Sequence, residues 1–171
     1  FFCLATKYIC EHVFQSWWCK LSVRKQKEFP AYLASLIHHF FMVPYAFYQI
    51  YKDFQRSDEE YNNIHYSVVE SSVGPFSLGY LLGDTFCFAF EAALGGKAEY
   101  LIHHVMGVWL VVALVHGPGH LGRAFPHFLL CESSAFCFNL AWVLRSFEIF
   151  QGSTLVLILE LGFAFFFLFT R

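Results

Sequence analysis

The sequence has few charged residues, no basic run and no close pair of cysteines. Only 14% of its 171 residues are charged, well below the roughly 25% of an ordinary soluble domain. The net charge is -2 and no Lys/Arg cluster alternates with aromatic residues, which argues against nucleic acid as a partner. None of the six cysteines forms a pair at two-residue spacing, so cysteine does not predict a metal site here.

Apolar side chains are instead abundant. They make up 57% of the chain, and aromatic residues make up 21%, with 23 Phe. A soluble domain of about 150 residues still exposes about 30% of its unfolded-chain surface, so a soluble fold of this length could not bury so much apolar area. The composition therefore predicts a protein whose remaining apolar surface is covered by a lipid bilayer.

Six apolar stretches approach the length needed to cross that bilayer, since a core about 30 Å thick takes about 20 helical residues. They predict an all-α, multi-pass transmembrane helical bundle. The predicted spans are residues 1–18, 31–51, 76–94, 100–116, 125–144 and 153–169. The connections 52–72 and 117–119 are expected to be a polar loop and a Gly-Pro-Gly break.

The basic residues predict the orientation. Connection 19–30 is the most basic, with Lys20, Arg24, Lys25 and Lys27, and the positive-inside rule places it in the cytoplasm. Six spans then leave both ends of the chain on the opposite side, so we expect a seventh span beyond Arg171. We divide the chain into residues 1–29, a first span with its basic loop, and residues 30–171, one incomplete domain.

Two adjacent histidines, His103 and His104, enter the apolar stretch 100–116. Ionisable groups are costly inside a membrane and usually serve a function there, with a polar partner nearby. With a rise of about 1.5 Å per residue, several polar residues in other spans lie at overlapping depth. The candidate partners are Asp84, Glu91, His38, His39 and Glu132. The pattern predicts a polar cavity inside the bundle.

Three kinds of chemistry suit such a cluster. Imidazole can act as a general base or carry an acyl group while a carboxylate orients it. Histidine with carboxylate also binds Zn or Fe, although adjacent histidines point about 100° apart on a helix, which disfavours a shared metal. Finally, the histidines can simply hydrogen-bond to neighbouring helices and fix their packing.

Several stretches resemble the TLC-domain membrane proteins, which include the ceramide synthases. Residues 100–105, Tyr-Leu-Ile-His-His-Val, are similar to the paired-histidine motif of that family, and 79–84, Gly-Tyr-Leu-Leu-Gly-Asp, to the span before it. Residues 129–136 stand at a second family motif, and 35–38 resemble an earlier one that ends in histidine. The resemblance covers roughly residues 30–171.

The second motif differs from that of the ceramide synthases. Where they carry His-Asp and a further Asp, this chain has Cys131, Glu132 and Ala135. It is thus more similar to the TLC-domain branch that does not consist of synthases. The resemblance implies an endomembrane protein, in the endoplasmic reticulum or a related membrane, which acts in lipid homeostasis by binding a lipid or acyl chain without a cofactor.

The resemblance also implies the site residues. His103 and His104 would contact the lipid, and they would be catalytic only if the protein is an enzyme. Asp84, Glu132, His38 and Asn139 would bind or orient the lipid. One alternative is a ceramide-synthase-like N-acyltransferase that joins an acyl group from acyl-CoA to a sphingolipid long-chain amine. Another is a non-catalytic membrane adaptor.

Overall fold

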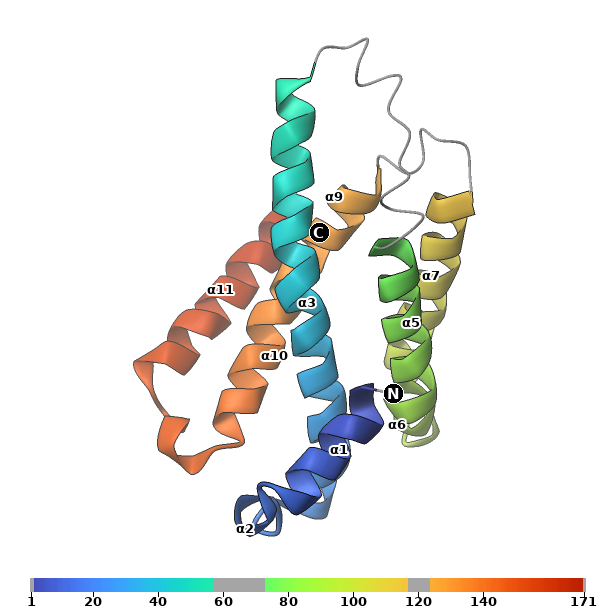
Figure 1. Ribbon diagram of the computed structural model, residues 1–171. Coiled ribbons are helices and arrows are strands. Elements are labelled where there is room, and N and C mark those ends of the chain that lie inside the picture. Colours follow the sequence, from blue (N-terminus) through green and yellow to red (C-terminus); the bar gives the residue numbers. More distant parts are fainter. Residues whose placement is uncertain (1, 57–72, 117–123, 171) are drawn as a thin grey trace.

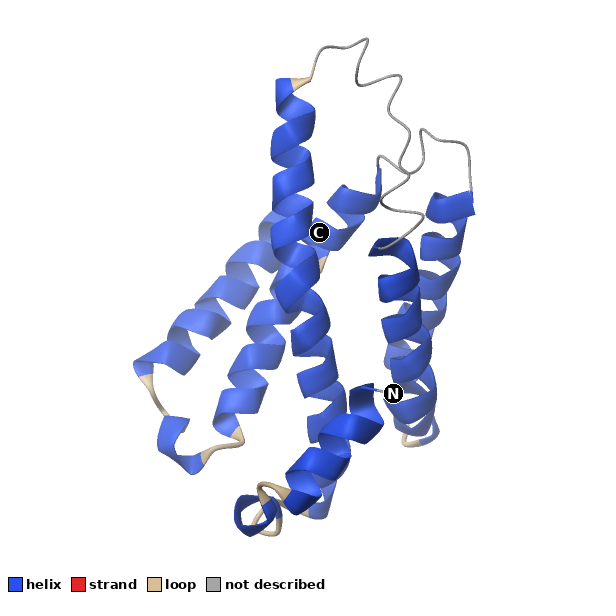
Figure 2. Cartoon of the chain, viewed as in Figure 1, coloured by secondary structure: helices blue, strands red, loops and turns tan. Residues whose placement is uncertain are grey.

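Figure 1 shows a computed structural model of the chain, which describes residues 2–56, 73–116 and 124–170. These residues form helices joined by short turns, with no strand among them (Figure 2), which confirms the predicted all-α class. The α-helices are α1 (Phe2–His12), α2 (Gln15–Trp18), α3 (Val23–Gln55), α5 (Gly74–Asp84), α6 (Phe90–Leu94), α7 (Ala98–His116), α9 (Ala124–Cys131), α10 (Ser133–Arg145) and α11 (Thr154–Thr170). A π-helical turn, η2 (Thr85–Ala89), joins α5 to α6, and a 3-10 turn, η3 (Glu148–Phe150), precedes α11.

The long helices alternate in direction along the chain. In Figure 1, α3 rises, α5 to α6 descends, α7 rises, α9 to α10 descends and α11 rises again. Helix α3 packs against α5 on one side and against α9 and α10 on the other, while α7 packs on α5 and α11 on α10. Each predicted stretch from 76 onward therefore corresponds to one pass of the bundle.

Helix α3 is longer than the predicted span 31–51. Ser22 caps its first turn, because the Ser22 Oγ accepts a hydrogen bond of 3.3 Å from the backbone N–H of Lys25. A serine N-cap stabilises the start of a helix, so the helix begins here although the segment is rich in basic residues. The prediction that 19–30 is a loop is wrong from Val23 onward, and the division at residue 29 falls within α3. Residues 52–55, predicted as loop, also belong to α3, and 57–72 lie outside the described residues.

The predicted first span, 1–18, is not one helix. The chain turns after His12 and divides it into α1 and α2. With 11 residues, α1 is about 16 Å long at 1.5 Å per residue, too short to cross a bilayer. The turn lets Trp17 stack on Phe147, with ring centroids 4.5 Å apart, and lets Trp18 pack against Phe29. The chain thus turns at this end of the bundle so that its aromatic side chains can pack, and it does not continue as one helix.

Ion pairs join the N-terminus of α3 to the turn between α6 and α7. Lys27 Nζ lies 2.6 Å from a Glu91 carboxylate oxygen, and Lys97 Nζ lies 3.5 Å from Glu28. The two basic connections therefore share one end of the bundle, as the alternation of spans requires. Glu91 was a candidate partner of the histidines, and this prediction is wrong, because its carboxylate turns outward to Lys27.

The interior contains buried polar side chains beside its apolar core, while the outer surface is rich in large apolar side chains. The interior holds His38, His39, Asp84, His104 and Glu132, each at most 9% exposed. Large apolar side chains instead cover much of the outer surface of the helices. They include Ile102, Met106, Trp109, Leu161, Phe165, Leu168 and Phe169. Such an apolar exterior is expected of helices surrounded by lipid.

One described helical stretch, 124–145, meets the length and hydropathy expected of a membrane span, and Ala98–Ala113 and Thr154–Thr170 are shorter apolar helices. The count of six spans and the seventh beyond Arg171 stay predictions.

Gly107 provides a test of the packing between α5 and α7. A Cβ built on it would lie 3.3 Å from both methyl groups of Leu81, so Gly107→Leu should overpack this crossing. We expect a loss of about 1–3 kcal/mol, measured as a lower melting temperature in detergent. Gly79→Leu is the control, since no described atom lies within 4 Å of its built Cβ. Equal melting temperatures for the two variants would contradict close packing at this crossing.

Candidate functional site

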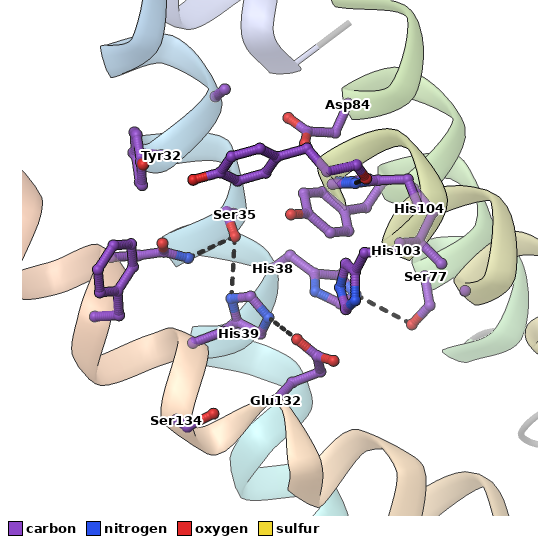
Figure 3. A pocket seen from close by; sticks show the side chains of 18 of the residues that line it. Tyr32, Ser35, His38, His39, Ser77, Asp84, His103, His104, Glu132 and Ser134 are labelled. Carbon is purple, nitrogen blue, oxygen red and sulfur yellow. Dashed lines mark hydrogen bonds and ion pairs between the residues drawn. The ribbon is translucent and has the colours of Figure 1, made fainter. Parts of the chain in front are cut away.

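A cavity of about 570 Å³ lies in the middle of the bundle and is lined by α3, α5, α7, α9, α10 and α11. Figure 3 shows its polar side chains, which come from separate helices and converge on one space. All the site residues predicted from the sequence line it: His38, Asp84, His103, His104, Glu132 and Asn139. The structure therefore contains the predicted cavity, whereas the role of each residue stays a prediction.

His104 and Asp84 form a close, buried polar contact in the cavity. The Nε2 of His104 lies 2.7 Å from a carboxylate oxygen of Asp84, and its Nδ1 lies 2.7 Å from the carbonyl oxygen of Tyr100. A carbonyl can only accept, so Nδ1 carries a proton and donates it. A second proton is then shared between Nε2 and the carboxylate. Both nitrogens of His104 are engaged, and the residue is only 6% exposed.

The π-helical turn η2 begins directly after Asp84. A π-turn contains one residue more than an α-turn and is common at functional sites. The hydroxyl of Thr85 donates a hydrogen bond of 2.6 Å to the carbonyl oxygen of Leu81, which supports the backbone where the helix changes. Nothing in the apolar sequence of this segment indicated the turn.

His103 has different surroundings from its neighbour. It lines the same cavity but is exposed, and its ring meets that of His104 edge to face with centroids 5.5 Å apart. The two adjacent histidines are therefore not equivalent. His104 is held between a carbonyl and a carboxylate, while His103 lies on the wall of the cavity.

A second histidine–carboxylate pair lies across the cavity. The Nε2 of His39 is 3.3 Å from Glu132, its Nδ1 is 3.3 Å from the hydroxyl of Ser35, and the amide of Asn139 donates to that hydroxyl at 2.7 Å. Hydrogen bonds thus connect α10 through α3 to Glu132 (Figure 3). Glu132 occupies the single break between α9 and α10, which interrupts the predicted span 125–144.

The sequence predicted Glu132 as a carboxylate that orients the pair at 103 and 104, and this role stays a prediction; in the structure Glu132 makes a hydrogen bond with His39. His39 was considered only as a possible partner, and Ser35 was not identified as a site residue. The spacing of four residues between Ser35 and His39 is a signal that could have found them, because residues i and i+4 share one face of a helix.

The rest of the cavity wall is mainly aromatic. These side chains are Tyr32, Tyr80, Phe88, Tyr100, Phe128, Phe138, Phe163 and Phe167. Two of the Phe residues in the predicted span 153–169, Phe163 and Phe167, line the cavity. Three carboxylates line the cavity, those of Asp84, Glu99 and Glu132, whereas no Lys or Arg does so among the described residues. Nor do these residues contain a set of three His, Cys, Asp or Glu side chains placed to hold a metal ion.

The model of the TLC domain family matches residues 28–171, which is most of the chain. The chain belongs to the TLC domain family. This family is membrane-associated and its proteins are linked to membrane lipids, in agreement with the apolar exterior of the bundle. No curated protein and no solved structure shows significant similarity to the chain. His103, His104, Asp84 and Glu132, which lie in the stretches that resemble TLC motifs, all line the cavity.

The buried pair of His104 and Asp84 predicts that a substitution of Asp84 lowers the stability of the protein strongly. Asp84→Leu leaves the imidazole of His104 buried without its carboxylate, and losing one partner of a buried pair costs about 3–5 kcal/mol in soluble proteins and about 1–2 kcal/mol between membrane helices. We expect a lower melting temperature in detergent. The matched control Glu91→Leu breaks an exposed pair, worth about 0–1 kcal/mol. A stability loss at Glu91 equal to that at Asp84 would contradict the assignment.

Proposed function

We propose that this TLC-domain protein binds a lipid or acyl chain in the central cavity and acts in membrane lipid homeostasis. The observation that supports this proposal is the cavity itself, because two buried histidine–carboxylate pairs line it together with aromatic side chains. Polar groups that only joined helices would leave no such space between them.

The size and lining of the cavity fit a lipid. Its volume of about 570 Å³ lies within the ~300–1,000 Å³ of ordinary ligand pockets. The phenyl rings offer a surface for hydrocarbon, and His103, Asp84 and Glu132 offer contacts for a carbonyl or a hydrogen-bond donor. Its carboxylates disfavour an anionic headgroup inside the cavity. Localisation in the endoplasmic reticulum or another endomembrane is part of this proposal and is supported by the family resemblance.

The proposal predicts a lipid that co-purifies with the protein. Native mass spectrometry of the detergent-purified protein should show a bound lipid, identified by lipidomics. His103→Ala combined with His104→Ala should lower its occupancy about tenfold or more, the effect of losing one or two polar contacts. Ala135→Phe, which fills the cavity and keeps every polar group, should do the same. Ala98→Phe on the exposed start of α7 is the control.

The outcomes separate the interpretations. Loss of lipid in both cavity variants, with helical content unchanged, supports the site. Lipid retained in Ala135→Phe would contradict it. A protein that carries no lipid, and whose histidine variants only melt earlier, would instead be the membrane adaptor.

The contact between His104 and Asp84 favours a second candidate, a ceramide-synthase-like N-acyltransferase. Acyl-CoA would supply the acyl group. The amine nitrogen would attack the thioester carbonyl, the C–S bond would break, and an imidazole would accept the amine proton and protonate the departing thiolate. Since both nitrogens of His104 are engaged, His103 would be the base, and His104 would position it.

This second candidate predicts that substitutions of the two histidines affect turnover differently. Purified protein supplied with acyl-CoA and a long-chain amine should form an amide. His103→Ala should abolish turnover, since removing a general base costs typically 10²–10⁴-fold, about 3–5 kcal/mol. His104→Gln should lower turnover less, because Gln can still contact Asp84. Amide formation that continues unchanged in His103→Ala would eliminate this mechanism.

A further inference from the structure

A second cavity lies beside the first. This groove of about 320 Å³ separates α3 from α5 and η2. Its lining residues are Ala34, Ile37, His38, Pro75, Phe76, Gly79, Tyr80, Gly83, Asp84 and Cys87. The function proposed above uses the central cavity and not this groove. His38, Tyr80 and Asp84 belong to the walls of both cavities.

Gly79 and Gly83 open the groove. They lie one helical turn apart on α5 and both line the groove, but neither lines the central cavity. No described atom lies within 4 Å of a Cβ built on either residue. The space beside them therefore belongs to the groove, and side chains introduced there would extend into it.

His38 lines the groove and carries a buried ring nitrogen, Nδ1, that has no hydrogen-bond partner among the described residues. Its Nε2 lies 3.1 Å from the hydroxyl of Ser77, and that hydroxyl donates to the sulfur of Met42 at 3.5 Å. We take the tautomer in which the Ser77 hydroxyl donates to Met42 and accepts from Nε2 of His38, which leaves a lone pair on Nδ1. His38 is 5% exposed, and its Nδ1 has no hydrogen-bond partner among the described residues. A buried acceptor without a partner is unfavourable.

The ring of His38 crosses the wall between the two cavities. Ser77, at its Nε2, lines only the central cavity, whereas Phe76 lines only the groove. The ring lies nearly parallel to those of Tyr80 and Phe76, with centroids 4.2 and 5.7 Å away. Nδ1 is itself buried, so a ligand in the groove contacts it only once side chains around the ring move.

We propose that the groove binds a neutral membrane lipid whose polar group is a single hydroxyl, which donates a hydrogen bond to Nδ1 of His38. The apolar walls and glycine face would hold the hydrocarbon. Asp84 lines the groove, and no Lys or Arg does so among the described residues, so phosphate is disfavoured. A packed helix from a second copy would not satisfy Nδ1, because its backbone N–H groups are engaged within the helix.

The test uses two photoactivatable, clickable probes, a sterol and a straight-chain long alcohol, each with its methyl ether counterpart. The full chain is placed in phosphatidylcholine nanodiscs, labelled and mapped by peptide mass spectrometry. The hydroxyl probe should label residues of α3 and α5 around the groove. The ether cannot donate to Nδ1, so it should label about tenfold less. The sterol and alcohol arms distinguish a fused-ring ligand from a linear one.

Groove variants locate the site. Gly79→Leu and Gly83→Leu should each lower labelling by the hydroxyl probe about tenfold, while Leu82→Phe, outside the groove on the same helix, should leave it unchanged. His38→Phe should make the hydroxyl and ether probes equal. Circular dichroism checks the fold of each variant. If one glycine variant fails to fold, the other still tests the groove.

Three results would overturn the proposal. These are equal labelling by hydroxyl and ether probes in the unmodified protein, full labelling in both glycine variants, and cross-links confined to peptides remote from the groove. A glycine variant that only changes the oligomeric state, without any probe labelling, would assign this face to a second copy of the chain instead.

Discussion

Each buried imidazole–carboxylate contact holds two parts of the bundle together. Asp84 ties α5 to α7 through His104, and Glu132 ties the break between α9 and α10 to α3 through His39. Both pairs are buried, and separating the partners of a buried pair is costly if the helices slide or rotate. The same contacts therefore determine the helix positions and define the polar centre of the cavity. In this domain, packing and the candidate site share one set of side chains.

Much of this arrangement could be predicted from the sequence. Apolar stretches of suitable length located the helices of the bundle from residue 76 onward, because burial in lipid and helix length are coupled. The depth of Asp84, His38 and the pair at 103 and 104 could be derived from the helical rise alone. Polar groups at one depth in apolar helices must find one another, so convergence followed from the cost of leaving them unpaired.

The partners themselves could not be predicted in this way. Whether Glu132 meets His39 or His104 depends on the rotation of each helix about its axis, which spacing along one chain leaves open. The π-turn after Asp84 and the break at Glu132 change that rotation locally, and neither has a Pro or Gly at the point of change. The start of α3 was missed for another reason, since Ser22 is a local capping signal inside a segment interpreted by its charge.

The π-turn also bears on how the chain length can vary among relatives. A π-turn amounts to an α-helix with one inserted residue. Deleting one residue from Thr85–Ala89 would restore a regular helix, with the flanking segments α5 and α6 still facing the same way. A deletion elsewhere in this pass would rotate everything beyond it by about 100°. Within this pass, Thr85–Ala89 is thus the segment where evolution can remove a residue and preserve the faces of both flanks.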